Sequence, residues 1–253
     1  MVRKLLICGL LAGLCGGLLA TGFARVAGEP QVARAISFEA RQARAAGEPA
    51  EKPLVSRAEQ RGLGLLTAAV VYGLALGGLF ALAFTAAYGR VGRAGPGRTS
   101  MWLAAFAFVT IFLVPFVKYP ANPPSVGDPN TIGKRTAIYL IMILISLLAA
   151  IAAVRLRGIL AERLAAAPAV VCAAGCYLLV VVIAGLLLPS VNEVPKTFPA
   201  VTLYRFREAS IGMQAVLWTT IGLVFAATAE RVMTGRTMLP RRRPAGPARS
   251  AAD

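Results

Sequence analysis

The sequence predicts an all-α integral membrane protein with about six transmembrane helices and proline-rich outer loops. Three observations carry this prediction. Of the 253 residues, 57% are hydrophobic, and the mean hydropathy is +0.69. Charged residues make up 15% of the chain, where a soluble domain carries about a quarter. These charges gather between apolar runs that approach the roughly 20 residues a helix needs to cross a bilayer.

Six runs without Asp, Glu, Lys or Arg are the expected spans: residues 5–23, 63–88, 101–117, 137–154, 169–188 and 211–229. The polar, alanine-rich residues 24–62 predict a helical hairpin on the outer surface, with the second Gly-Glu-Pro at 47–49 as its turn. Residues 1–234 would form a single membrane domain. Residues 235–253, dominated by Pro, Gly and Arg, predict a disordered basic tail.

The first apolar run has two interpretations. Its basic start and apolar stretch resemble a cleaved signal sequence, but signal peptides usually have shorter apolar regions. Gly9, Gly13 and Gly17 recur at every fourth residue, a pattern that lets two membrane helices pack closely. We expect the run to be retained as a true span.

The orientation rests on local clusters, because Lys and Arg divide almost evenly between the two sides. Arg90, Arg93 and Arg98 crowd one loop, and Arg155 and Arg157 begin another. We therefore expect both termini in the cytoplasm, which places eight of the eleven acidic residues in the outer loops. The net charge of +16 is explained by contact with anionic lipid headgroups. Nucleic-acid binding is not expected, since the basic residues are not interleaved with aromatics.

The composition argues against an enzyme. The chain has no His, so a Ser-His-Asp triad, a Cys-His pair and the His-based zinc hydrolase motif are excluded. No acid lies inside a predicted span. The sequence Gly92–Thr99, GRAGPGRT, approaches a phosphate-binding loop, but it joins two spans rather than a strand and a helix, so nucleotide binding is not expected.

The four cysteines, Cys8, Cys15, Cys172 and Cys176, all fall inside predicted spans, so no disulfide framework is implied. Cys172 and Cys176 share a helix face and would offer two soft ligands to a copper-like ion. We favour the alternative that they fill a helix interface as small apolar residues.

The most unusual stretch is Lys118–Pro129, KYPANPPSVGDP. Pro115 predicts a kink in the third span, and the prolines that follow forbid helix and leave backbone carbonyls unpaired. Such a segment must pack against protein or face water, where its carbonyls are cation ligands. It also fits a rigid turn in which Asp128 caps the fourth helix and Pro129 takes its first position.

A second proline-rich stretch follows the fifth span, around Asn192 and Glu193. If both stretches gather at one outer vestibule, oxygen ligands for a metal ion would come from Asp128, Glu193, Asn122 and Glu29. The alternative is a surface ion network of Glu193 and Glu208 with Arg205 and Arg207.

The chain resembles the CbtA family of cobalt transporter subunits of prokaryotes. The resemblance lies in KYPANPPSVGDPNTIGKRT (118–136), LPSVNEVPKTFPAVTLYRFREAS (188–210) and RGLGLLTAAVVYGLALGGLFALAFTAAYGR (61–90). It implies a multi-pass inner-membrane protein associated with cobalt uptake for cobalamin. It also implies a small one-span partner, CbtB, whose histidine-rich tail would supply the imidazoles this chain lacks.

The predicted function is therefore a membrane subunit of a divalent metal uptake transporter, with cobalt as the transported ion and no resident cofactor. The alternative is a non-transporting scaffold or assembly subunit. That alternative is favoured by the uncharged spans, since ion pathways usually carry some intramembrane polarity; Gln214, Met213 and Thr67 are the modest exceptions.

Overall fold

The computed structural model describes residues 1–47, 55–92, 94–124 and 126–234, which contain helices and no strand. Six helical stretches are long and apolar enough to cross a membrane: Val2–Ala45, Arg57–Ala87, Pro96–Lys118, Pro129–Leu160, Ala166–Leu187 and Ala200–Thr234. Each overlaps one apolar run of the sequence, so the predicted fold class is confirmed. The expected tail at 235–253 and the Glu-Pro of the expected turn lie outside the described residues.

Four of these stretches are built from shorter helical pieces. The first two are α1 (Val2–Phe23), η1 (Ala24–Gly28) and α2 (Glu29–Ala45), then α3 (Arg57–Glu59), η2 (Gln60–Gly64) and α4 (Leu65–Ala87). The next two are α5 (Pro96–Ala107), η3 (Phe108–Leu113) and α6 (Val114–Lys118), then η4 (Pro129–Thr131) and α7 (Ile132–Leu160). The remaining two stretches are the single helices α8 (Ala166–Leu187) and α9 (Ala200–Thr234).

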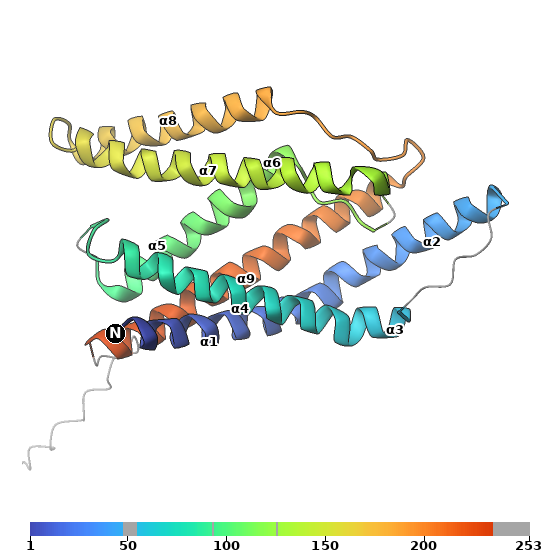
Figure 1. Cartoon of the computed structure of the whole chain (residues 1–253), viewed down its shortest axis with the longest axis horizontal. Helices are drawn as coiled ribbons and strands as arrows, with labels where there is room; N and C mark the ends of the chain where they lie inside the picture. Colours follow the sequence, from blue (N-terminus) through green and yellow to red (C-terminus); the bar gives the residue numbers. More distant parts are fainter. Residues whose placement is uncertain (48–54, 93, 125, 235–253) are drawn as a thin grey trace, which may run out of the picture.

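Residues 24–62, which were expected to form a separate helical hairpin on the outer surface, do not form a separate element. They include helices, but α2 continues α1 through the π-helical turn η1. The joint helix has 44 residues and is about 66 Å long, about twice the thickness of the hydrocarbon core. Figure 1 shows α2 rising from the end of α1 toward the side of the molecule where α7 begins. The hairpin is therefore largely an extension of the first two spans.

A π-helical segment precedes Pro115 in the third span. Proline has no N–H, so the carbonyl four residues earlier loses its helical partner. The chain responds with the wider turns of η3, directly before α6, in which Pro115 is buried. The helix continues to Lys118, so the predicted disturbance is absorbed as π-helix.

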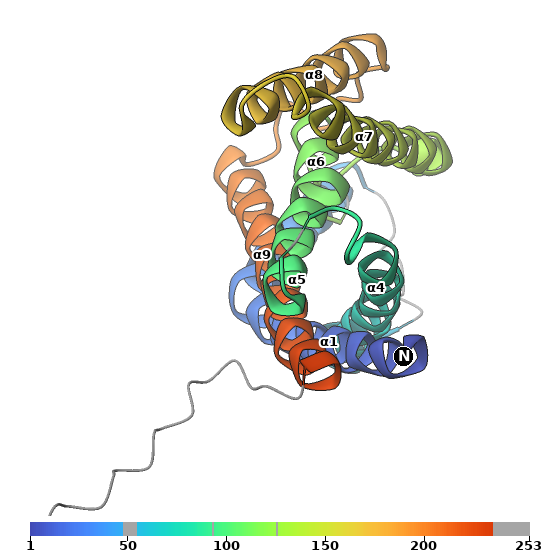
Figure 2. The ribbon, with the colours of Figure 1, turned by 90° about the vertical axis from the view of Figure 1, so that its left-hand side faces the viewer.

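The core lies between α1, α4, α5 and α9, which cluster in the end-on view of Figure 2. Its buried side chains include Leu5 of α1, Phe84 of α4, Ala104 of α5, and Trp218 and Phe225 of α9. Phe225 packs edge-on against Phe84, with ring centroids 5.0 Å apart. The first span is thus part of the central bundle.

Close packing of α1 against α4 confirms the prediction drawn from the glycine spacing. The two helices run antiparallel, and Gly13 faces Gly73 while Gly9 faces Gly77. A Cβ atom at Gly17 would lie 2.6 Å from the carbonyl oxygen of Ala69, nearer than carbon and oxygen approach without displacement. The backbones are therefore in direct contact, which hydrogens on Cα allow and methyl groups do not.

Helices α7 and α8 form a hairpin along one side of this core (Figure 1). The hydroxyl groups of Ser146 and Tyr177 lie 2.9 Å apart and join the two helices. Most of α8 is exposed, including Cys172 and Cys176. The expectation that these two cysteines fill a helix interface is therefore wrong within the described chain; both lie on the outside of the hairpin.

The glycine contacts predict different effects of one substitution at two positions of α1. Gly13→Ala places a methyl group against the Gly73 carbonyl and should cost about 1–3 kcal/mol of stability. Gly22→Ala meets no atom within 4 Å and should be neutral or stabilising, because Ala is the better helix former. Thermal unfolding in detergent measures both. Equal effects of the two substitutions would contradict the close packing.

Candidate functional site

The two proline-rich connections meet at the end of the bundle opposite the N-terminus (Figure 1). They run from Tyr119 to Asp128 and from Leu188 to Pro199. The Tyr119 hydroxyl donates a hydrogen bond to the Pro189 carbonyl at 2.8 Å, and Lys118 Nζ lies 3.4 Å from Ser190 Oγ. The prediction that both stretches gather at one end is confirmed.

Glu193 is the centre of this meeting point. Its Oε2 accepts a hydrogen bond from the Asp128 backbone N–H at 2.9 Å, and its Oε1 accepts one from the Thr131 hydroxyl at 2.7 Å. Arg135 Nε lies 3.5 Å from Oε2 and completes an ion pair. The carboxylate thus joins the connection after α8 to the start of α7.

Gly127 makes this approach feasible. Its φ of +110° is strained for a residue with a side chain, and a Cβ atom there would lie 2.8 Å from Glu193 Oε2. Arg135 also crowds the position. The Val-Gly-Asp-Pro turn therefore requires glycine for both its conformation and its contact with Glu193.

Asp128 has the capping role that the sequence predicts. Its Oδ1 accepts a hydrogen bond from the Asn130 backbone N–H at 2.8 Å, and Pro129 begins the 3-10 turn η4 that leads into α7. This occupies an N-terminal donor that would otherwise be unsatisfied. The Asp128 carboxylate is therefore directed to its own helix start.

Asn122 is held by an arginine from α9. Arg207 Nη2 donates a hydrogen bond to Asn122 Oδ1 at 3.0 Å, and Arg207 Nε donates to the Ala121 carbonyl at 3.3 Å. The Pro123 carbonyl accepts a weak hydrogen bond from Val126 N–H at 3.3 Å. Carbonyls that the proline pattern leaves without helical partners are thus engaged in part by the protein itself.

Glu29 forms an ion pair with Arg57, whose Nη2 lies 2.6 Å from Glu29 Oε2. This contact joins the start of α2 to α3, at the base of the helical extension. Beside it, Arg25 Nε donates a hydrogen bond to the Arg61 carbonyl at 3.3 Å. Glu29 therefore ties the first two spans together at this level.

Helix α2 also covers the second proline-rich connection. Phe38 packs edge-on against Phe198 with ring centroids 5.1 Å apart, and Gln42 donates a hydrogen bond to Thr197 at 3.0 Å. Ala35, Val126 and Phe198 form a small buried cluster. This role is not evident from the sequence, because the apolar residues of α2 are few and their partners lie far away in the chain.

The alternative ion network forms only in part. Arg205 pairs with Glu208 at 3.1 Å, but Glu193 pairs with Arg135 and Arg207 bonds to Asn122. Of the four candidate metal ligands, contacts join Asp128 and Glu193 directly, while Asn122 and Glu29 are engaged by separate arginines. In the described part of the chain, no group of three or more Asp, Glu or Cys residues is arranged to hold a metal ion.

Three buried side-chain polar atoms lack hydrogen-bond partners among the described residues: Arg135 Nε, Gln214 Oε1 and Trp218 Nε1. Arg135 keeps its ion pair with Glu193, whereas Gln214 and Trp218 belong to α9. These two lie four residues apart, and Gln214 follows Arg207 by two helical turns, so Arg207, Gln214 and Trp218 share one face. The sequence already distinguishes Gln214 as an amide in an apolar span. Trp218 gave no such signal, because an indole is also an ordinary core side chain.

The stretch that approaches a phosphate-binding loop, Gly92–Thr99, lies at the opposite end of the bundle. The α5 N-terminus begins at Pro96, and the Gly97 N–H donates a hydrogen bond to Glu230 Oε2 of α9 at 2.8 Å. A carboxylate of the chain thus occupies the position where a helix N-terminus attracts an anion.

A bundle of six membrane-length helices, with its carboxylates and arginines interlocked at one end, defines a multi-pass α-helical membrane protein. The chain belongs to the CbtA family, because the family model for the probable cobalt transporter subunit (CbtA) matches residues 2–230. The match runs from α1 into the last part of α9. No curated protein and no solved structure matches the chain.

The contacts of Glu193 predict a dependence of stability on pH. Hydrogen bonds from Thr131 and the Asp128 backbone, aided by the charge of Arg135, lower the pKa of the Glu193 carboxyl below its ordinary value of 4.5. A carboxyl whose pKa is lower in the folded state stabilises the fold above pH 4.5 and loses this contribution as the pH falls further. Glu193→Gln should therefore lower the melting temperature at pH 6 and matter progressively less below pH 4.5. A difference that grows toward low pH would contradict these contacts.

Proposed function

We propose that the chain is the membrane subunit of a system that takes up a divalent metal ion, cobalt, across a prokaryotic inner membrane. The family supports cobalt as the cargo and transport as the task. The observation that carries the proposal is the meeting of Asp128 and Glu193, through the 2.9 Å hydrogen bond from the Asp128 N–H to Glu193 Oε2. Two carboxylates from separate connections would then receive the ion at one end of the bundle.

The chemistry of these groups suits entry and release. Carboxylate and amide oxygens are hard ligands, and an ion held weakly by few of them is free to move on. Three of the four candidate ligands are already engaged by arginines: Glu193 with Arg135, Asn122 with Arg207, and Glu29 with Arg57. An arriving dication competes with these guanidinium groups for the oxygens, which keeps the affinity of the site for the metal ion low. When no ion is bound, the guanidinium groups hold the oxygens in place.

Passage through the bundle would need a further polar contact beyond these loops. Gln214 and Trp218 continue the α9 face that begins at Arg207, and their buried polar atoms have no hydrogen-bond partner among the described residues. In this proposal Gln214 Oε1 is the next oxygen along the path.

The proposal includes a second subunit. The chain has no His, and its described residues offer no cluster of three acidic or thiol ligands. A small one-span, histidine-rich partner of the CbtB type would supply the stronger ligands. With both termini in the cytoplasm, the loops that carry Asp128 and Glu193 face outward, and the direction is uptake. The task is transport, without catalysis and without a resident cofactor.

Removing both carboxylate charges should abolish cobalt accumulation. Asp128→Asn with Glu193→Gln keeps oxygen atoms for the hydrogen bonds from Asn130, Thr131 and Asp128 while deleting the charge. Uptake of cobalt by cells that express the chain with its partner is the measurement. Glu208→Gln is the matched control, because Glu208 pairs with Arg205 at the same end. Unchanged uptake in the double variant at normal protein level would remove these residues from the mechanism.

Gln214→Leu separates function from stability. Its Oε1 has no partner to lose among the described residues. The free energy of unfolding should therefore stay unchanged or rise by about 1 kcal/mol. Cobalt uptake should fall severalfold if Gln214 contacts the ion. A loss of stability together with normal uptake per folded molecule would show a structural role instead.

A further inference from the structure

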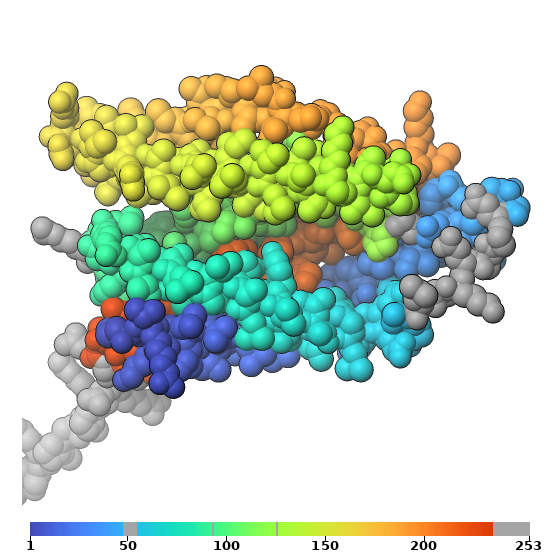
Figure 3. Space-filling model, viewed as in Figure 1, coloured from blue at the N-terminus to red at the C-terminus, as the bar shows by residue number. Residues whose placement is uncertain are grey.

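A groove separates α7 and α8 from the core at the end of the bundle opposite Glu193. Its volume is about 620 Å³, and the space-filling view in Figure 3 shows the molecule hollowed between α7 and α4. Its walls come from α5, η3, α7 and α8, with Phe106, Val109, Val154, Val170 and Ala173 among the apolar lining. The short loop at Arg90–Gly92 closes one side.

The groove exists because small residues line it and because the hairpin is held mainly at its other end. Ala150, Ala153 and Gly158 of α7 face it together with Ala174 of α8. None of them fills the space that a Leu or Phe would occupy. The proline-rich connections hold the hairpin at the Glu193 end, and no equivalent cluster of polar contacts holds it among the described residues here.

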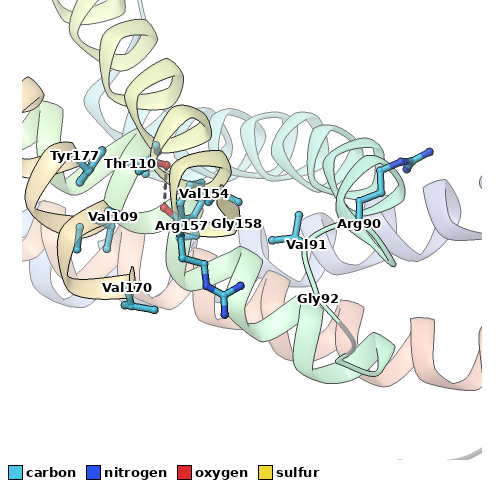
Figure 4. Close-up of a pocket in the computed structure, with 15 residues that line it drawn as sticks. Arg90, Val91, Gly92, Val109, Thr110, Val154, Arg157, Gly158, Val170 and Tyr177 are labelled. Carbon is cyan, nitrogen blue, oxygen red and sulfur yellow. Dashed lines mark hydrogen bonds between the residues drawn. The ribbon is translucent and has the colours of Figure 1, made fainter. Parts of the chain in front are cut away.

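One arginine of the groove is available for a ligand. Figure 4 shows Arg90 directed away from the other lining residues, and its guanidinium donates to the Ala86 carbonyl at 2.9 Å. Arg157 instead projects at the end of the groove where Gly158 and Val170 lie (Figure 4). Its guanidinium has no ion pair or hydrogen bond with the described residues.

The surroundings of Arg157 are strongly basic. In the described chain, this end of the bundle carries eight Lys or Arg residues and only two acids, Glu162 and Glu230. Glu230 already accepts the hydrogen bond from Gly97. The occupant of an apolar groove with this rim should therefore be an amphiphile with a negative head.

The length of the groove decides between a lipid and a helix. Along α7 the lining residues run from Ala150 to Gly158, which at 1.5 Å per residue is about 12 Å. That matches roughly one leaflet of the hydrocarbon core, which is about 30 Å thick in total. A partner transmembrane helix would need a groove through both leaflets.

We propose that this groove binds one anionic phospholipid, with an acyl chain against Val109, Val154 and Ala174 and its phosphate at Arg157. The lipid fills the space between the hairpin and the core. Arginine suits the phosphate because its planar guanidinium donates two parallel hydrogen bonds.

The test uses the full-length chain in mild detergent and native mass spectrometry. Phosphatidylglycerol and phosphatidylcholine with identical acyl chains are titrated separately. The wild-type chain should bind phosphatidylglycerol about fivefold more tightly, the size expected for one basic residue at a membrane surface. Arg157→Gln should abolish this preference. Arg155→Gln, which removes a nearby exposed arginine outside the groove lining, should leave it intact.

A second pair of variants tests the acyl chain. Ala174→Leu fills the groove and should weaken binding of both lipids, whereas Cys176→Leu, on the same exposed helix but outside the lining, should not. Equal binding of the two lipids by the wild-type chain would overturn the proposal. An equal loss of the preference for phosphatidylglycerol in Arg155→Gln and Arg157→Gln would also overturn it. So would competition by millimolar inorganic phosphate for lipid binding together with no effect of Ala174→Leu, because that result would indicate an anion site without a lipid.

Discussion

The carboxylate of Glu193 connects the two loops that attach the α7–α8 hairpin to the rest of the bundle, and both ends of the molecule depend on this connection. At its own end it brings Asp128, Thr131 and Arg135 together. At the far end, the hairpin diverges from the core and leaves the groove beside Arg157. Polar groups thus gather around Glu193 at one end of the hairpin, and apolar space remains at the other.

The charges at the Glu193 end are arranged as pairs. Arginines reach Glu193, Asn122 and Glu29, so these oxygens sit beside cations of the protein. Such pairs between partly exposed groups contribute little to stability, but they set the electrostatic conditions that any incoming metal ion meets. In the proposed function, a dication would gain these oxygens only by displacing a guanidinium. Such weak, oxygen-based contact would suit passage of the ion, and stronger ligation would come from another chain.

The local features of this protein could be predicted from its sequence, whereas the contacts between distant residues could not. Apolar runs predict the spans because the bilayer sets the length of a helix that crosses it. Gly9, Gly13 and Gly17 predict a close helix contact because only glycine lets two helix backbones touch. Asp128 followed by Pro129 is recognisable as a helix start. In contrast, the partner of Asn122 is 85 residues away, and several arginines are equally plausible from sequence. The exposure of Cys172 and Cys176 was also unpredictable, since a uniformly apolar helix has no face that distinguishes lipid from protein.

The central claim is that metal reaches this chain through oxygen atoms at the Glu193 end. X-ray absorption at the cobalt edge, measured on the purified chain loaded with Co²⁺, tests it directly because the coordinating elements are read from the spectrum. We predict a first shell of oxygen alone, with no sulfur. A cobalt–sulfur distance, which only the cysteines or methionines would supply, would contradict it.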